Sequence, residues 1–286
     1  MESQRKHART FSFEFFPPKT PEGKAKLRTT WQQLAQLKPR FFSCTFGAGG
    51  STQQGTLDTV LEIREAGHEA APHLSCVASS KAEIKAILSR YKESGIRHIV
   101  ALRGDLPSGV AMAGELRYAN ELVSYIRETT GDWFNIEVAC YPEYHPQTRN
   151  AADEVKNFKR KIDAGANAAM TQYFYNPDAY FHFIDECETA GIDVPIVPGI
   201  MPIGNFSQLA RFSDACGAEI PRWMRIKLEG FRDDTASIRA FGLDVVTALC
   251  DKLLAAGAPG LHFYTLNQAG ATSAIWNRLG LQEGER

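Results

Sequence analysis

The chain has 286 residues and carries 32 lysine and arginine against 33 aspartate and glutamate side chains, a net charge of −1 at pH 7. This balance predicts no basic face for a nucleic acid or an anionic membrane. No apolar run approaches the ~20 residues that a bilayer-spanning helix needs.

The amino-terminal segment and the cysteines indicate in which compartment the protein works. Residues 1–9 are polar and basic with no apolar stretch, so we expect a loose tail and not a signal peptide. The six cysteines are spread along the chain without a CxxC pair, and Cys44, Cys76 and Cys140 fall in or beside apolar runs. Such usage is typical of reduced, buried thiols and predicts a cytoplasmic enzyme.

Apolar runs rich in β-forming residues recur along the chain at the spacing of one strand and one helix. An eighth run covers residues 261–265, and the first seven begin near Thr10, Phe41, Ala70, His98, Ile136, Ala168 and Pro195. Helical patterns lie between the runs, at residues 20–37, 80–94, 115–129, 151–164, 177–190 and 235–256. The clearest begins at Ser80, which can form a capping box with Glu83.

The glycines that end the helical patterns, and the spacing of the strands, predict the architecture. Gly67, Gly95, Gly165, Gly191 and Gly257 each follow a helical pattern, at the position where a left-handed residue most often ends a helix. The long interval between the seventh and eighth runs predicts extra helices at residues 206–215 and 221–228. We therefore expect an α/β fold, a single (β/α)8 TIM barrel over residues 10–286 with extra helices between strands 7 and 8.

In such a barrel the carboxyl ends of the strands meet at one rim, where active sites are built. Polar side chains end the predicted strands: Glu14, Thr45, His73, Arg103 with Asp105, Tyr141 with Glu143 and His145, Gln172, and Asn267 with Gln268. Taken singly, His73 could be a core histidine with a backbone partner, and Arg103 and Asp105 could form a plain ion pair. Together they exceed what packing requires and predict a site for a large ligand.

Two acids among these residues point to proton chemistry. Glu14 stands between Phe13 and Phe15, where a carboxylate without a role or a partner would carry an uncompensated desolvation cost. We expect both Glu14 and Asp105 to be held at strand ends in apolar surroundings. The sequence has neither the ligand spacing of a metal centre nor the GxSxG motif of a serine hydrolase.

The helical pattern at residues 151–164 carries a polar stripe with two possible roles. Glu154, Asn157 and Lys161 share one face, and Arg160 stands beside them. The stripe is either a solvated face or, because it follows Tyr141 and His145, a surface that holds the phosphates and ribose of a nucleotide.

Four segments in this order resemble the bacterial type of the 5,10-methylenetetrahydrofolate reductase family: residues 12–18 (SFEFFPP), 71–74 (APHL), 99–105 (IVALRGD) and 261–267 (LHFYTLN). The resemblance runs from about Phe11 to Leu279. It implies an FAD-containing barrel that reduces 5,10-methylenetetrahydrofolate to 5-methyltetrahydrofolate with NADH or NADPH, in the one-carbon metabolism that supplies methionine. It also implies a homo-oligomer and a ping-pong reaction order.

The resemblance assigns roles to individual residues. Glu14 matches the general acid, which would protonate the folate N5 so that the five-membered ring opens to an iminium. Asp105 matches an acid that stabilises this cation. The matching FAD contacts are Thr45, His73, Arg103, Gly104, Asp105, Tyr141, His145, Glu154, Asn157, Arg160 and Lys161. The matching substrate contacts are Gln172, Gln208, Phe212 and Gln268, with Phe212 as a ring on which dinucleotide and folate stack in turn.

Three questions stay open at this level. Glu154 stands where the family often has an aspartate, and Gln268 where many members have an arginine for the glutamate tail of folate. The preference for NADH or NADPH depends on the loop at residues 45–54, with NADH the favoured donor. The alternatives are another flavin barrel, such as a proline-dehydrogenase-like oxidase of a cyclic amine, or a protein that binds flavin or folate without turnover.

Overall fold

The computed structural model describes residues 1–47, 52–105, 114–148 and 150–281. Nine strands in this part of the chain form one sheet in the order β7-β6-β5-β4-β3-β2-β1-β9-β8, and the registered pairs are parallel. The strands are β1 (Thr10–Phe15), β2 (Phe41–Cys44), β3 (Ala70–Ser75), β4 (His98–Leu102), β5 (Asn135–Cys140), β6 (Ala168–Thr171), β7 (Ile196–Val197), β8 (Gly199–Ile200) and β9 (Gly260–Tyr264).

The expected seventh strand consists of two short pieces, β7 and β8, separated by Pro198 alone. Proline has no N–H for the ladder, which interrupts the strand at this residue. β7 stands at one end of the strand order and β8 at the other. Since only Pro198 separates β7 from β8 along the chain, the two ends of the strand order meet at this proline. The fold is therefore of the (β/α)8 TIM-barrel class that the sequence predicts.

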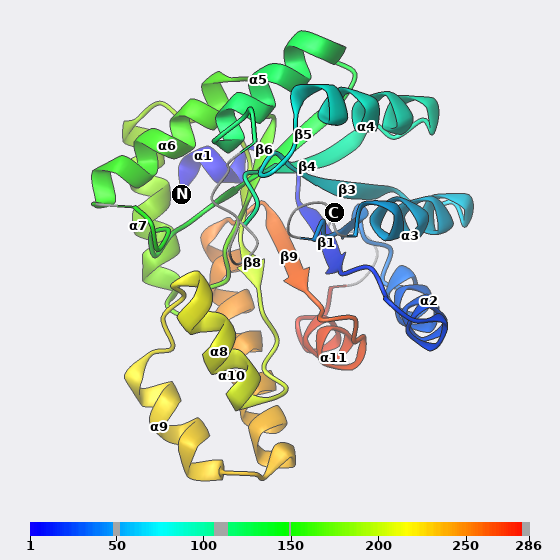
Figure 1. The fold of residues 1–286 in the computed structure, drawn as a ribbon. Coiled ribbons are helices and arrows are strands. Elements are labelled where there is room, and N and C mark those ends of the chain that lie inside the picture. The colour runs from blue at the N-terminus through cyan, green and yellow to red at the C-terminus, as the bar shows by residue number, and fades with distance from the viewer. Residues whose placement is uncertain (48–51, 106–113, 149, 282–286) are drawn as a thin grey trace. The chain divides into compact units, whose positions relative to one another are not determined.

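Helices alternate with these strands along the chain (Figure 1). They are α1 (Glu2–Arg5), α2 (Pro21–Ala35), α3 (Gln53–Glu65), α4 (Lys81–Glu93), α5 (Ala119–Thr130), α6 (Ala151–Asp163), α7 (Pro177–Thr189), α8 (Phe206–Cys216), α9 (Arg222–Phe231), α10 (Thr235–Ala256) and α11 (Gly270–Arg278). α8 and α9 confirm the extra helices before the last strand, and the Ser80 capping box opens α4 as expected. Each described helix is too short or too polar to cross a membrane.

Internal contacts divide the chain into two compact units. The first unit comprises Met1–Phe11, Cys140–Asn157 and Met170–Arg286, and the second comprises Ser12–Ala139 and Phe158–Ala169. β1, β5, β6 and α6 each run through a boundary between these segments. The assignment of residues 10–286 to one domain stays a prediction.

The second unit contains the first half of the strand series. On β1, Phe13 and Phe15 are fully buried, and the Phe15 ring stacks on Phe42 of β2 with centroids 5.6 Å apart. Since successive strand residues face opposite sides, burial of these phenylalanines on one side leaves Glu14 on the other. The register places Ser43 of β2 opposite Glu14.

The first unit contains the last strands and the helices that follow β6. The long helix α10 packs against α7, α9 and α11. Gly260, which opens β9, has a φ of +120°, and an added Cβ would lie 1.7 Å from the Thr10 carbonyl oxygen. Only glycine allows this close approach at the start of the strand.

The expectation of a loose tail before residue 10 is wrong for residues 2–5, which form α1. Gln4 is 1% exposed, its Nε2 donates to the Val194 carbonyl at 3.2 Å, and its Oε1 accepts from the Ile196 N–H at 2.8 Å. One side-chain amide thus satisfies two backbone groups at the start of β7. Such a long-range bond has no local sequence signal.

Candidate active site

Glu14 and His73 form a pair at the carboxyl ends of β1 and β3 in the second unit. The Glu14 Oε2 lies 3.3 Å from the His73 Nε2, and their side chains are 14% and 5% exposed. The register explains the contact: Ser43 faces Glu14 on one side and Ala71 on the other, and His73 follows Ala71 by two residues on the same face. His73 is buried as a core histidine would be, and its Nε2 lies beside a carboxyl group.

The segment after β4 carries a half-buried cation, Arg103, next to the strand β3 that holds His73. The Arg103 Nε donates to the Gly104 carbonyl at 3.3 Å. Gly104 has a φ of +81°, and an added Cβ would lie 2.6 Å from the Ser75 Cβ. Asp105 is exposed, so the expectation that it sits in apolar surroundings is wrong, because the left-handed turn at Gly104 ends the buried strand before Asp105 is reached.

Thr45 and two cations of α6 complete the second unit's candidate residues. The Thr45 N–H donates to Phe15 at 2.9 Å, and the Thr45 carbonyl accepts from the Thr56 Oγ1 at 2.7 Å, which fixes the end of β2. The Lys161 Nζ is half-buried and donates to the Ala139 carbonyl at 2.6 Å. Arg160 is exposed. Lys161 thus reaches a strand end, whereas Arg160 faces solvent.

In the first unit, the candidate flavin contacts cluster around the segment that follows β5. The Tyr141 and His145 rings pack edge to face with centroids 4.7 Å apart. Glu154 is buried, and its Oε2 accepts from the His145 N–H at 3.1 Å and the Thr148 Oγ1 at 2.6 Å. Glu154 therefore fixes this loop onto α6, while Asn157 is exposed. A contact between Glu154 and a ribose stays a prediction.

The candidate substrate residues of the first unit lie on three elements. The Gln172 Oε1 accepts from the Tyr173 N–H at 3.0 Å, so this amide is held against its own backbone after β6. Gln208 and Phe212 are four residues apart on α8 and share a face. Phe212 is 39% exposed, an unusual position for a phenylalanine. Gln268 is exposed after the turn that follows β9.

Glu143 has an unusual environment that sequence reasoning does not single out, although it lies among the strand-end residues. Its Oε2 accepts from the Glu219 N–H at 2.8 Å, which joins the loop after β5 to the end of α8. Its Oε1 is buried without a hydrogen-bond partner among the described residues. Burial is the main cause that raises the pKa of Glu143 to about 7. The only local signal is its place between Tyr141 and His145.

Glu143→Gln is expected to flatten the dependence of stability on pH. A folded-state pKa of about 7 against an ordinary value of 4.5 means that the native protein holds a proton that the unfolded chain has lost. Stability therefore falls as pH rises from about 4.5 to about 7, and the loss persists above that range. After a discount for the partial exposure of Glu143, the free energy of unfolding falls by about 1–2 kcal/mol across this range. Denaturant unfolding at pH 5 and pH 8 measures it, with Glu93→Gln, exposed on α4, as the control. Wild-type pH dependence in the Glu143 variant would contradict the assignment.

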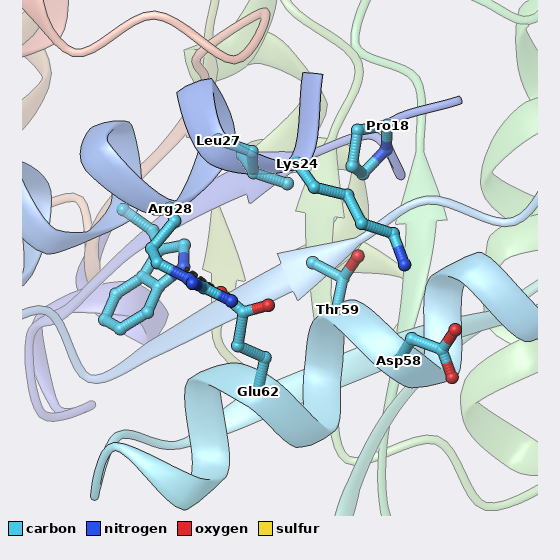
Figure 2. A pocket seen from close by; sticks show the side chains of 8 residues that line it. Pro18, Lys24, Leu27, Arg28, Asp58, Thr59 and Glu62 are labelled. Carbon is cyan, nitrogen blue, oxygen red and sulfur yellow. Dashed lines mark hydrogen bonds and ion pairs between the residues drawn. The ribbon is translucent and has the colours of Figure 1, made fainter. Parts of the chain in front are cut away.

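A small pocket between α2 and α3 is separate from these residues (Figure 2). It is lined by Pro18, Lys24, Leu27, Arg28, Trp31, Asp58, Thr59 and Glu62. Figure 2 shows Arg28 and Glu62 pointing toward each other, and the Arg28 Nε lies 2.8 Å from the Glu62 Oε1. This ion pair forms part of the pocket's lining, and none of the strand-end candidates lines the pocket.

Residues 48–51, within the loop expected to set the nucleotide preference, lie outside the described residues.

Comparison with solved structures supports the fold. A protein from Clostridium thermocellum, described as uncharacterized and as binding two copies of 5-methyl-5,6,7,8-tetrahydrofolic acid, superposes with a TM-score of 0.67 at 15% identity, covering 98% of this chain and 95% of that one.

Comparison of sequences identifies the family. The family model for methylenetetrahydrofolate reductase matches residues 1–280. The 5,10-methylenetetrahydrofolate reductases of Salmonella typhimurium and Escherichia coli are each 42% identical over 274 residues, covering 96% of this chain and 91% of theirs. A probable methylenetetrahydrofolate reductase (NADH) of rice is 39% identical, and the match covers 96% of this chain but 48% of the rice protein. The chain therefore belongs to the methylenetetrahydrofolate reductase family, oxidoreductases that reduce 5,10-methylenetetrahydrofolate with a nicotinamide co-substrate.

Proposed function

We propose that Glu14 is the general acid of this reduction, that FAD is the resident redox cofactor, and that NADH is the electron donor. The observation that carries the proposal is the half-buried Glu14 carboxyl at the end of β1, in contact with the His73 imidazole. A carboxyl at a barrel strand's carboxyl end stands where this fold places catalytic groups. Family membership supports this reaction over the oxidation of a cyclic amine.

The residues of the second unit fit a flavin dinucleotide. FAD carries two phosphates, and Arg103 and Lys161 are half-buried cations near strand ends that can pair with them. The His73 Nε2 is buried, is not in hydrogen-bond geometry with any described residue and lies 3.3 Å from the Glu14 Oε2, so the imidazole is a polar group on the site's wall. Thr45 adds a hydroxyl on β2's end. When bound there, FAD supplies hydride transfer between the nicotinamide and the folate.

The chain's own residues supply acid catalysis and charge stabilisation. Glu14 delivers its proton to the nitrogen at which the five-membered ring of methylenetetrahydrofolate opens, and the opening leaves a cationic iminium on the substrate. The Asp105 carboxylate stabilises this positive charge. Gln172 rotates from its own backbone to hydrogen-bond the pterin. The phenyl ring of Phe212 stacks on each substrate in turn.

Phe212→Ala is expected to raise KM for both NADH and methylenetetrahydrofolate without lowering stability. Aromatic stacking on a planar ligand contributes about 1–3 kcal/mol, which corresponds to roughly 5- to 150-fold in binding. Phe212 is 39% exposed, so its removal leaves little core unfilled. Steady-state kinetics with each substrate varied gives the two KM values. Trp223→Ala, 58% exposed on α9, is the control, and an equal effect of both variants would contradict the stacking role.

An anaerobic titration tests the proposal. The purified protein is expected to be yellow with bound FAD, to bleach with NADH more readily than with NADPH, and to regain its colour with methylenetetrahydrofolate. The names of the rice and Arabidopsis thaliana relatives, which specify NADH, support this donor. A protein that takes up no FAD, or whose reduced flavin the folate does not reoxidise, would overturn the proposal. A cytoplasmic location and a homo-oligomeric state stay predictions.

A further inference from the structure

His73 is a titratable group in direct contact with the proposed proton donor. Its imidazole comes from β3, two strands away from Glu14 in the sheet order, and reaches across Ser43 of β2. The Nε2 and the Glu14 Oε2 are 3.3 Å apart, slightly longer than a good hydrogen bond. The imidazole is nearly enclosed, so it has few rotamers by which to leave the carboxyl.

The reaction requires Glu14 to be reloaded once in each turnover. Reduction of the methylene bridge to a methyl group takes up one hydride and one proton, and the hydride comes from the nicotinamide. The proton leaves Glu14, which then remains as a carboxylate only 14% exposed. A carboxylate in such a place needs a donor to stabilise it and a source from which to regain its proton.

We propose that His73 is a positioning residue that stabilises the Glu14 carboxylate and returns its proton, an inference that rests on the proposed function. The Glu14 O–H bond breaks as an N–H bond forms on the folate. The His73 Nε2–H bond then breaks as the Glu14 O–H bond re-forms, and the imidazole regains a proton from water. No electrons move in these steps, and one solvent proton is consumed.

Other described groups stand near the pair on the neighbouring strands. On β2, Ser43 does not titrate in the physiological range, and burial raises the pKa of the Cys44 thiol so that it stays neutral. On β4, Val100 stands opposite His73 in the register. Arg103, which follows β4, is half-buried, and a guanidinium offers no acceptor atom to the proton. Because the Glu14 Oε2 and the His73 Nε2 are in direct contact, a proton can pass between them. Without His73, the carboxyl would regain its proton from solvent alone, and that supply falls as pH rises.

His73→Gln tests the inference, since the glutamine amide keeps a donor near the Nε2 position but cannot return a proton. The rate at which methylenetetrahydrofolate reoxidises the reduced flavin is measured against pH. In His73→Gln the pH of half-maximal rate is expected to fall, so that the rate above neutral pH drops by about tenfold, less than the 10²–10⁴-fold of a lost general acid. A drop that is equal at every pH would overturn the inference, because it is the mark of a structural or flavin-binding role.

A second readout is independent of activity. The nitrogen NMR signals of isotope-labelled His73, assigned by their loss in His73→Gln, are expected to differ between wild-type protein and Glu14→Gln, because the partner changes from a carboxyl to an amide. His73→Asn, assigned in the same way, replaces the glutamine variant if that one does not fold. Superimposable signals would overturn the inference.

Failure of the inference and failure of the proposed function give different results. If Glu14→Gln retains the folate half-reaction, the general-acid assignment is wrong, and the inference fails with it. If Glu14→Gln loses that half-reaction while the pH profile of His73→Gln matches wild type, the proposed function stands and the role of His73 is overturned. In the Glu14→Gln background, His73→Gln should produce no further shift of the profile.

Discussion

Glu14→Gln is expected to reduce its flavin with NADH at the wild-type rate and to lose reduction of methylenetetrahydrofolate by about 10²–10⁴-fold, the usual contribution of one general acid. Glutamine keeps the size of the side chain but has no acidic proton. Hydride transfer from NADH needs no proton from the protein, so only the second half-reaction requires Glu14. Anaerobic stopped-flow spectroscopy follows the two half-reactions separately at the flavin absorbance.

The chain offers a matched control for this variant. Glu137 on β5 is also a buried carboxylate beside a histidine, with its Oε1 3.0 Å from the His98 Nε2. This pair involves the first residue of β4, the end of a barrel strand that serves stability and not catalysis. Glu137→Gln is expected to lower stability and to spare both half-reactions. A Glu14 variant that loses both half-reactions equally would show that the assigned role is wrong.

Among glycine-to-alanine substitutions at the described glycines, Gly260→Ala is expected to lower stability most. At a φ of +120° the new Cβ would overlap the Thr10 carbonyl oxygen, which is backbone and cannot swing aside. Strained backbone alone costs about 1–3 kcal/mol, and overpacking adds a further ~1–3 kcal/mol. The sum is about 2–6 kcal/mol, and for a chain of this size the melting temperature falls by about 2–4 °C for each kcal/mol.

Thermal unfolding followed by circular dichroism measures this loss. Gly270→Ala is the control, because an added Cβ there meets no atom within 4 Å and the residue begins α11. That control is expected to leave stability unchanged or to raise it slightly, since alanine favours a helix over glycine. Equal melting temperatures for the two variants would contradict the close packing of β9 on Thr10.

The periodic pattern of apolar residues and the glycines at helix ends predict most of the fold. The bounds of α10 are those expected from the pattern, and the glycines at helix ends adopt the expected positive φ. The helices that the pattern does not single out are α1, α3 and α11, and each of them lacks a side-chain cap at its amino end. A cap is one signal by which a helix start is found in a sequence. The lack of a cap is not the whole reason, because α5 and α9 also lack a side-chain cap and are predicted.

The candidate site is predicted less completely, because its contacts depend on register and on turns. The sequence places Glu14 and His73 at strand ends, but their contact follows from the pairing of β1, β2 and β3, which no local pattern specifies. The exposure of Asp105 follows from the left-handed turn at Gly104. The burial of Glu154 follows from its bonds to His145 and Thr148. The roles of these residues stay predictions.

The most direct test of the central claim is a crystal structure of the oxidised protein, which has no hydride to transfer, with FAD and methylenetetrahydrofolate bound. The quantity measured is the distance from the Glu14 carboxyl to the ring nitrogens of the folate. The account predicts a separation within hydrogen-bond reach, about 2.6–3.2 Å, with His73 on the far side of the carboxyl. A folate whose bridging nitrogens contact a different acid, with Glu14 turned away from them, would contradict it.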